Sequence, residues 1–222
     1  MAKTILVSNR MSTSVARAAE GFQFNQSMGG LATGLKSMHE KEGSLWVGWS
    51  GLASDELTSA EREEISKTLR KDYKSVPVDL SSEDLDLFYY GFCNRTIWPL
   101  FHYFPTYTEY DNETWDRYEK VNRTFFNRVM EVAEESDYIW VHDYHLMLLP
   151  RMLKDALPHS RIGFFLHIPF PSYEVFRLLP WRTELLQGLL GADLVGFHTY
   201  DYARHFLSSV RRILAAEHHM AQ

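Results

Sequence analysis

The stretch RIGFFLHIPFPSYEVFRLLPW, Arg161 to Trp181, joins an almost uninterrupted apolar run to a loop that contains two prolines. Residues Ile162–Ile168 are typical of a strand covered on both faces, as strands of parallel sheets are. Pro169 and Pro171 fix φ and supply no backbone N–H, so they end the strand abruptly. We therefore expect His167 at the carboxyl edge of a sheet. Taken alone, this residue is equally compatible with a satisfied histidine of the core.

Comparable apolar runs recur along the chain and alternate with segments of helical periodicity. Strands are predicted at Thr4–Ser8, Leu45–Trp49, Ser75–Val78, Tyr138–Val141, Ile162–Ile168 and Leu194–Phe197. Helices are predicted at Leu31–His39, Ser59–Tyr73, Glu83–Tyr90, Trp115–Glu135, His145–Ala156, Tyr173–Leu179, Arg182–Leu190 and Tyr200–Ala216. The alternation predicts an α/β fold of the Rossmann-like, doubly wound kind, with a mostly parallel sheet and helices on both of its faces.

Local signals support several of these helices. Thr58 and Glu61 form a candidate capping box, and the Ser172 hydroxyl is expected to cap the helix that follows the two prolines. Pro150 is expected to end or kink the segment that contains it. The last helix carries a four-residue spacing that is typical of a stripe buried in the core: Tyr202, Phe206, Val210 and Leu214.

The composition is that of a soluble globular protein. The chain has 222 residues, of which 45% are hydrophobic and 23% charged, and we expect one domain over residues 1–222. The formal net charge of −6 argues against nucleic acid or an anionic membrane as the main partner. No apolar run approaches the roughly 20 residues that span a bilayer. Cys93 is the single cysteine, so an internal disulfide is excluded and a reducing compartment, by default the cytoplasm, is expected.

Polar residues follow four of the predicted strands at the point where each strand ends. They are Asn9 with Arg10, His142 with Asp143, His167, and His198. In doubly wound folds ligands bind beyond the carboxyl ends of the strands. Segments that are far apart in the sequence therefore point to a single site at one edge of the sheet.

Two of these features suggest binding of phosphate groups. Arg10 offers a planar, permanently charged fork that suits a phosphate, although a surface ion pair would use the same side chain. The run Met28-Gly29-Gly30-Leu31 opens a predicted helix, where small residues let a diphosphate approach free N–H groups. The run matches neither a P-loop nor GxGxxG, so an ordinary turn is the competing interpretation.

The sequence HDYH at residues 142–145 contains potential metal ligands, but adjacent residues after a strand diverge and no further ligand set accompanies them. Asp143 is better suited to accept hydrogen bonds from sugar hydroxyls. Aromatic side chains with polar edges suit pyranose rings, although most aromatics are core residues; the candidates are Trp49, Tyr89, Trp98 and Tyr103. No GxSxG elbow or Cys/His nucleophile is present, which excludes hydrolysis through an acyl-enzyme.

Several longer motifs occur in a distinctive order. The chain contains VSNR at Val7–Arg10, GGLATGL at Gly29–Leu35, WVGWSG at Trp46–Gly51, WPLFHY at Trp98–Tyr103, WVHDYHLMLLP at Trp140–Pro150, GFFLHIPFP at Gly163–Pro171 and GADLVGFHTYDYARHF at Gly191–Phe206. In this order they closely resemble the trehalose-6-phosphate synthase family, glycosyltransferase family 20, over nearly the whole chain. The resemblance implies the amino-terminal half of a two-domain GT-B fold. It also implies metal-independent, cofactor-free transfer of glucose from UDP-glucose to glucose 6-phosphate with retention, in trehalose biosynthesis.

The resemblance also implies roles for individual residues, carried over motif by motif. Contacts with the acceptor, its phosphate and its hydroxyls are implied for Arg10, Trp49, Tyr89, Trp98 and Asp143. Gly29 and Gly30 would face the donor's diphosphate. His167 would lie near the transferred glucose, and together with Asp143 it is the implied catalytic residue. No metal site is implied.

Two departures from the family pattern limit this transfer. Met11-Ser12-Thr13 follow Arg10, where the family usually continues with a proline-bearing turn. The chain also stops after the helix ending near Ala216, without the family's carboxyl-terminal domain and its nucleotide-binding groups. We therefore expect a fragment that is inactive alone, that meets UDP-glucose mainly through the missing domain, and that can form a homo-oligomer. The alternatives are a synthase with another acceptor, such as glycerol 3-phosphate, and a non-catalytic sugar-phosphate sensor or regulatory subunit.

Overall fold

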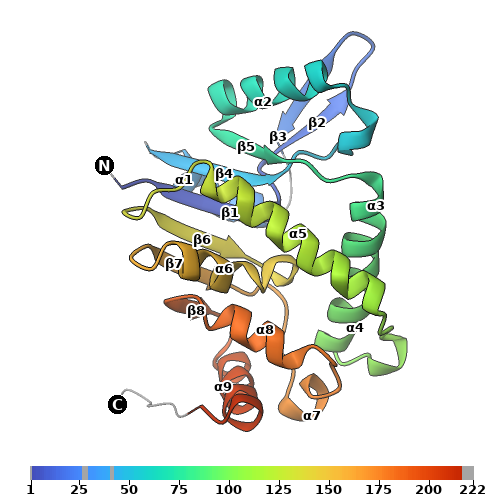
Figure 1. Ribbon diagram of the computed structural model, residues 1–222, viewed down its shortest axis with the longest axis vertical. Helices are drawn as coiled ribbons and strands as arrows, with labels where there is room; N and C mark the ends of the chain where they lie inside the picture. Colours follow the sequence, from blue (N-terminus) through green and yellow to red (C-terminus); the bar gives the residue numbers. More distant parts are fainter. Residues whose placement is uncertain (1, 27–29, 41–42, 217–222) are drawn as a thin grey trace.

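The computed structural model describes residues 2–26, 30–40 and 43–216. Its main sheet has six strands in the order β5-β4-β1-β6-β7-β8, and every neighbouring pair is parallel (Figure 1). The strands are β1 Thr4–Arg10, β4 Ser44–Trp49, β5 Ser75–Val78, β6 Tyr138–His142, β7 Arg161–Phe165 and β8 Leu194–Gly196. The chain winds outward from β1 in both directions. This topology confirms the doubly wound α/β prediction and places the switch point between β1 and β6.

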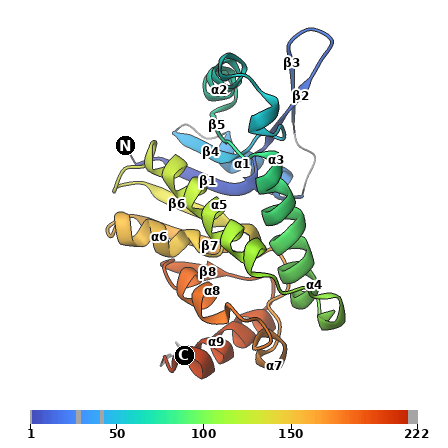
Figure 2. The ribbon, with the colours of Figure 1, turned by 45° about the vertical axis from the view of Figure 1, so that its right-hand side comes forward.

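Helices cover both faces of the sheet. On one face lie α1 Gly30–His39 and α2 Ser59–Tyr73. The other face carries α3 Ser82–Asp84, the π-helix η2 Leu85–Ile97, α4 Trp98–Phe101, α5 Asn112–Met130, α6 Leu149–Ala156 and α8 Arg182–Leu189. Figures 1 and 2 show α5, α6 and α8 side by side over this second face, with α7 Tyr173–Phe176 and α9 Tyr200–Leu214 beyond β8. Short 3₁₀ turns occur at Ser54–Glu56, Pro105–Tyr107 and Tyr144–Leu146.

The alternation of side chains along β1 explains why both faces need a helical layer. Ile5 and Val7 are fully buried in the cluster that includes α5, whereas Leu6 between them is buried on the opposite side. There it joins Trp46 of β4 and Ile65 of α2. Successive side chains of a strand point to opposite faces, so an entirely apolar strand requires cover on both.

An antiparallel hairpin was not predicted from the sequence. It consists of β2 Thr13–Arg17 and β3 Phe22–Gln26, and it follows β1 directly. Its strands are short, rich in polar residues and only partly buried, and they lack the apolar runs on which strand prediction depends. Gly21 sits in the connecting turn with a φ of 70°, a conformation that favours glycine.

Several predicted boundaries are wrong. The strand predicted to reach Ile168 ends at Phe165, and the helix predicted from His145 begins at Leu149, because Pro150 occupies its first turn. The helix predicted at Glu83–Tyr90 is part of a continuous helical segment over residues 82–101. The Ser172 side chain makes no capping hydrogen bond to the helix that follows it.

Other local predictions are confirmed. The Thr58 hydroxyl accepts a hydrogen bond from the Glu61 N–H, and the Glu61 carboxylate accepts one from the Thr58 N–H, which completes the capping box. On α9, Phe206 and Val210 are buried, and Tyr202 and Leu214 pack against the same core. The apolar stripe of the last helix is therefore a packing surface.

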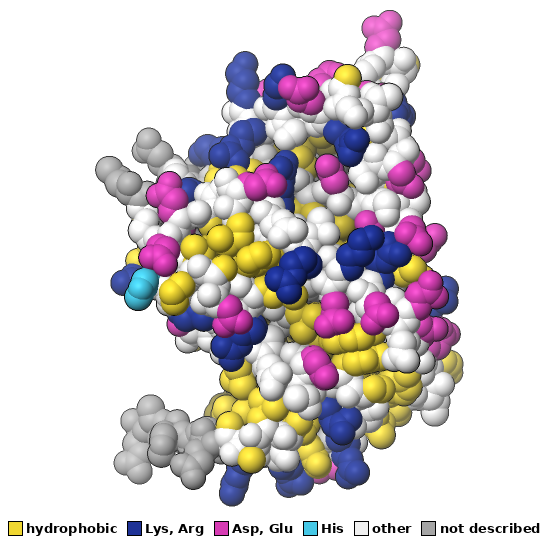
Figure 3. All heavy atoms as spheres, in the orientation of Figure 1, with side chains coloured by type: hydrophobic (Ala, Val, Ile, Leu, Met, Phe, Trp, Pro, Cys, Tyr) yellow, Lys and Arg dark blue, Asp and Glu magenta, His cyan; other side chains and the backbone are white. Residues whose placement is uncertain are grey.

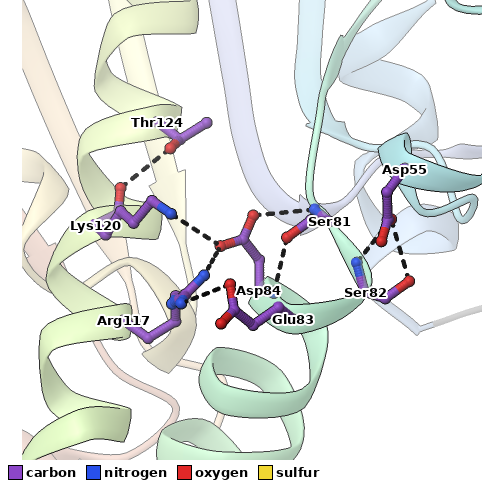
Figure 4. Close-up of polar contacts among 8 residues, drawn as sticks. All are labelled: Asp55, Ser81, Ser82, Glu83, Asp84, Arg117, Lys120 and Thr124. Carbon is purple, nitrogen blue, oxygen red and sulfur yellow. Dashed lines mark hydrogen bonds and ion pairs between the residues drawn. The ribbon is translucent and has the colours of Figure 1, made fainter.

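A polar network holds the start of the long helical segment (Figure 4). Arg117 of α5, whose side chain is only 14% exposed, lies 2.7 Å from Asp84 and 2.9 Å from Glu83. Asp84 in turn accepts a hydrogen bond from the Ser81 N–H, and Asp55 binds Ser82 in the same way. Because these charges are partly shielded from water, the network anchors the helix more firmly than exposed ion pairs would.

The surface over α5, α6 and α8 mixes charges of both signs. Figure 3 shows Lys and Arg side chains interspersed with Asp and Glu, with hydrophobic side chains between them. Within the described ranges, no helix combines the length and the apolar character that crossing a membrane requires.

Candidate active site

Two adjoining cavities open at the carboxyl ends of β1, β6 and β7, and each has a volume of about 640 Å³. The first, the Arg10 cavity, has a lining that includes Arg10, Tyr89, Trp98, His145 and Ile168. The second, the His167 cavity, has a lining that includes Gly30, Leu35, Trp140, His142, His167 and His198. Leu31 and Asp143 line both cavities. The site therefore consists of two compartments that meet at one carboxylate.

Arg10 is held on an aromatic support at the end of β1. Its guanidinium lies 4.5 Å from the centre of the Trp49 ring. Trp49 is 6% exposed and donates its indole N–H to the Leu52 carbonyl at 2.8 Å, so this ring is fixed. No carboxylate in the described part of the chain forms an ion pair with Arg10. The positive charge is therefore available to an anion, and Trp49 supports Arg10 from behind without lining the cavity.

Asp143 lies between the two cavities in a strained backbone conformation. Its φ of 74° is unusual for a residue with a side chain and costs about 1–3 kcal/mol. The Oδ1 atom accepts hydrogen bonds from the N–H groups of Tyr144 at 3.0 Å and His167 at 3.2 Å. Burial raises the pKa of Asp143 to about 6, against the lowering effect of these two hydrogen bonds. No hydrogen bond from the described residues reaches the second oxygen, Oδ2.

The π-helix brings Tyr89 and Trp98 to the same cavity. Trp98 follows Tyr89 by nine residues, which is about 2.5 turns of an α-helix and would place the two side chains on opposite sides. In a π-helix, with i→i+5 bonding, nine residues make about two full turns, so both side chains face the same way. Residues Leu85–Ile97 adopt this wider helix. The irregularity therefore builds one wall of the Arg10 cavity.

Each of these aromatic rings is braced by a histidine. The Tyr89 ring stacks on His145 at a centroid distance of 5.7 Å and an interplanar angle of 9°. Trp98, 43% exposed, stacks on His102 at 4.1 Å. Tyr103 is not part of either lining; its hydroxyl accepts a hydrogen bond from the Ser172 N–H at 2.8 Å. Trp98 therefore offers a supported, accessible aromatic face to a ligand.

His167 lies two residues beyond the end of β7 and contacts two other histidines. Its Nε2 is 3.1 Å from the Nδ1 of His142, and its ring centre is 5.6 Å from that of His198. Burial lowers the pKa of His142 to about 3 and that of His167 to about 4. Both rings are therefore neutral near neutral pH.

Unpaired buried polar atoms gather around the two cavities. Among the described residues they include Asn9 Oδ1, His142 Nε2 and both ring nitrogens of His145. Asn9 and His145 line the Arg10 cavity, and His142 lines the His167 cavity. Buried polar atoms are nearly always hydrogen-bonded in folded proteins, so this grouping marks a place where a ligand or water completes the hydrogen bonds.

The glycine prediction is only partly covered by the structure. Gly30 is the first residue of α1 and lines the His167 cavity, and a Cβ built on it would meet no atom within 4 Å. Gly29 lies outside the described residues. In the described ranges no three His, Cys, Asp or Glu side chains form a metal-binding group. His142 and His145 of the HDYH run line different cavities.

The stability of the folded chain is expected to fall as the pH drops below about 6.5, where unfolded histidines take up protons. His142, His145 and His167 stay neutral in the folded chain down to pKa values of about 3 to 4. Asp143 acts in the opposite sense, because its folded pKa of about 6 lies above the usual 3.8. The three histidines outweigh the one aspartate, so the unfolded state binds more protons than the folded state at pH values between about 6.5 and the folded-state pKa values of the histidines. In this window the free energy of unfolding falls by about 1–3 kcal/mol for each unit by which the pH drops.

Urea unfolding at about pH 7 and about pH 5 checks this expectation. His145→Phe removes one of the three histidines and is expected to reduce the slope by about one proton, or about 1.4 kcal/mol per pH unit. An unfolding free energy that stays constant or rises on acidification would contradict the assignment of neutral buried histidines.

Six residues predicted from the sequence line the two cavities: Arg10, Tyr89, Trp98, Asp143, Gly30 and His167. His142 was expected at the same sheet edge but was given no role, and neither His145 nor Ile168 was predicted to line the site. The two histidines stand in the HDYH run, so a signal was present. Between them lies Asp143 with its positive φ, a backbone conformation that no pattern of residue types indicates.

Comparison with known proteins gives one consistent result. The family profile of Glycosyltransferase family 20 matches residues 2–222. The alpha,alpha-trehalose-phosphate synthase [UDP-forming] A of Dictyostelium discoideum is 47% identical over 216 residues, which are 97% of this chain and 29% of that protein. The 56 kDa subunit of the Saccharomyces cerevisiae alpha,alpha-trehalose-phosphate synthase [UDP-forming] is 45% identical over 217 residues, 95% of this chain and 43% of that subunit.

Solved structures agree with the sequence relatives. A Burkholderia xenovorans alpha,alpha-trehalose-phosphate synthase in complex with glucose-6-phosphate superposes with a TM-score of 0.75 and 32% identity. The matched region is 95% of this chain and 43% of the Burkholderia chain. An Escherichia coli structure bound with UDP-2-fluoro glucose has a TM-score of 0.75 and 31% identity, covering 96% of this chain and 43% of its own. The chain thus spans less than half the length of each of these relatives.

Proposed function

The chain belongs to glycosyltransferase family 20, and from this premise we propose that it is the acceptor-binding part of a UDP-forming trehalose-phosphate synthase. The proposed reaction transfers glucose from UDP-glucose to glucose 6-phosphate and retains the configuration at the anomeric carbon. One observation carries the proposal: an unneutralised arginine and a partly buried carboxylate share one sugar-sized cavity, and a second cavity meets it at that carboxylate.

Glucose 6-phosphate fits the chemistry of the Arg10 cavity. The Arg10 guanidinium has no carboxylate partner among the described residues and offers a planar fork to the phosphate. The free oxygen of Asp143 accepts a hydrogen bond from a sugar hydroxyl, since the carboxyl is ionised above its pKa of about 6. The exposed face of Trp98 supplies an apolar surface for a pyranose ring.

The glucose unit of the donor is assigned to the His167 cavity. His167 lies at its wall, and α1 begins at Gly30, so the positive end of a helix dipole is close to this cavity. The Burkholderia xenovorans and Escherichia coli relatives bind glucose 6-phosphate and a UDP-glucose analogue, respectively. Two joined compartments match the two sugars of this reaction.

The proposed chemistry is a front-face displacement. The bond between the anomeric carbon and the UDP oxygen breaks as the acceptor hydroxyl oxygen bonds to the same carbon, on the same face. The hydroxyl proton passes to an oxygen of the departing diphosphate. Asp143 orients the acceptor hydroxyls, and His167 holds the donor glucose in place. Orientation of two bound reactants in this way can supply several kcal/mol of the barrier reduction.

The chain alone is proposed to be inactive. In a site that excludes water, each positioned donor aimed at developing charge contributes about 3–4 kcal/mol, or roughly a thousandfold in rate. Among the described residues that line the two cavities, Arg10 is the one arginine, and it forms no ion pair with a carboxylate. The groups that neutralise the departing diphosphate are therefore assigned to regions of the relatives that this chain does not match.

Incubation of the purified chain with UDP-glucose and glucose 6-phosphate is accordingly expected to release no UDP above the level without acceptor. A coupled UDP assay measures this directly, with a full-length relative as the positive control. Acceptor-dependent UDP release that disappears in Arg10→Ala would contradict the inactivity of the chain while supporting the assignment of the site. UDP release with glycerol 3-phosphate but not with glucose 6-phosphate would identify glycerol 3-phosphate as the acceptor instead.

A further inference from the structure

His142 occupies an unusual position at the end of β6. It is 1% exposed, and its Nδ1 lies 3.1 Å from the Nε2 of His167. Its other nitrogen, Nε2, is buried and has no hydrogen-bond partner among the described residues. Among the described residues, the one side-chain hydrogen bond of His142 is therefore with the histidine assigned to the donor glucose.

A hydrogen bond between two neutral imidazoles requires one ring to donate and the other to accept. Burial disfavours the charged form of both rings and lowers their pKa values. Each ring then carries one proton, and only two arrangements are possible. Either His142 donates from Nδ1 to His167, or His167 donates from Nε2 to His142.

The two arrangements differ in what remains at the buried Nε2 of His142. If His167 donates, His142 must carry its proton on Nε2, where a buried N–H group finds no acceptor. If His142 donates, Nε2 is a bare lone pair, and unsatisfied acceptors are tolerated better than orphaned N–H groups. The Trp140 ring, with its centre 4.7 Å from that of His142, offers at best a weak N–H···π contact.

We propose that His142 is a positioning residue that donates its Nδ1–H to Nε2 of His167 and thereby fixes His167 as the Nδ1–H tautomer. His167 Nδ1, which has no partner among the described residues, then presents a hydrogen-bond donor to the His167 cavity. The group it recognises must be an acceptor oxygen. That oxygen belongs to a hydroxyl of the donor sugar, an identification that rests on the proposed function.

The tautomers can be read directly by two-bond ¹H–¹⁵N correlation NMR of the ¹⁵N-labelled chain, because protonated and bare ring nitrogens have well-separated shifts. We expect His142 and His167 both to carry their proton on Nδ1. A protonated Nε2 in His167 would overturn the proposal. The measurement requires no substrate, so it remains informative even if sugar binding fails.

Two variants test the cause. His142→Phe removes the donor, and His167 is expected to shift towards the Nε2–H tautomer that unconstrained histidines favour. His142→Asn retains an amide donor near the position of Nδ1, and it is expected to preserve the Nδ1–H form even where the phenylalanine variant fails to fold. The matched control is His198→Phe, since His198 contacts the His167 ring without a hydrogen bond to it. Retention of Nδ1–H in a folded His142→Phe chain would overturn the proposal.

Discussion

Substitution of Arg10 by alanine is expected to weaken glucose 6-phosphate binding by about 10- to 100-fold, because a hydrogen bond to a charged group contributes about 1.5–3 kcal/mol. The guanidinium is supported by Trp49 and has no competing carboxylate among the described residues. Its removal therefore takes away the charged side chain that is proposed to bind the phosphate. Isothermal calorimetry with glucose 6-phosphate, glucose and inorganic phosphate separates the phosphate contribution from the contribution of the sugar.

Two variants make this result specific. Arg10→Lys keeps the charge but loses the planar fork and the stacking on Trp49, so an intermediate loss is expected. Arg17→Ala is the matched control, because Arg17 stands one strand away, pairs with Glu61 and lines neither cavity. An equal loss of affinity for glucose, or no loss in Arg10→Ala, would remove Arg10 from the phosphate site.

The largest structural effect is expected from Gly191→Ala. A Cβ at this position would lie 2.2 Å from Cα and 2.3 Å from the backbone nitrogen of Arg151 in α6. Backbone atoms in a packed helix cannot move aside as a flexible side chain can. Overpacking usually costs 1–3 kcal/mol, and this contact with backbone is expected to exceed about 3 kcal/mol. Gly191 is therefore required where the chain leaves α8 and passes α6.

Gly34→Ala provides the opposite outcome in the same measurement. Gly34 lies inside α1, and a Cβ there would meet no atom within 4 Å. Alanine is a better helix former than glycine, so a gain of about 0.5–1 kcal/mol is expected. Thermal and urea unfolding of both variants gives the comparison. A Gly191→Ala chain as stable as the parent would show that α6 and α8 are not packed as described.

The parallel sheet could be predicted from the sequence because each of its strands is a short apolar run, as a strand buried on both faces must be. The hairpin β2–β3 could not, since its strands are rich in polar residues and carry no such run. The π-helix was also missed. Phe88 and Phe92 have a four-residue spacing that fits an α-helix equally well. The segment packs closely on α5, because a Cβ built on Gly91 would lie 2.9 Å from Thr114 Cγ2.

The site also contains features that the sequence predicts and features that it does not. Arg10, Asp143 and His167 were predictable because parallel strands bring their carboxyl ends to one edge. The contact between His142 and His167 was not, because it depends on the register that sets His142 opposite Phe165 in β7. Residue types indicate which chemistry is present, whereas the backbone decides which pairs of residues meet.

The most direct test of the two-compartment site is a ¹H–¹⁵N NMR titration of the chain with glucose 6-phosphate. Shifts are expected at Arg10, Tyr89, Trp98 and Asp143, with smaller changes at His167 across the shared wall. The arginine-rich cavity between α7 and α9, which is lined by Arg204, Arg211 and Arg212, serves as an internal comparison. Shifts concentrated at those three arginines, with Arg10 and Asp143 unmoved, would contradict the assignment of the sugar phosphate to the Arg10 cavity.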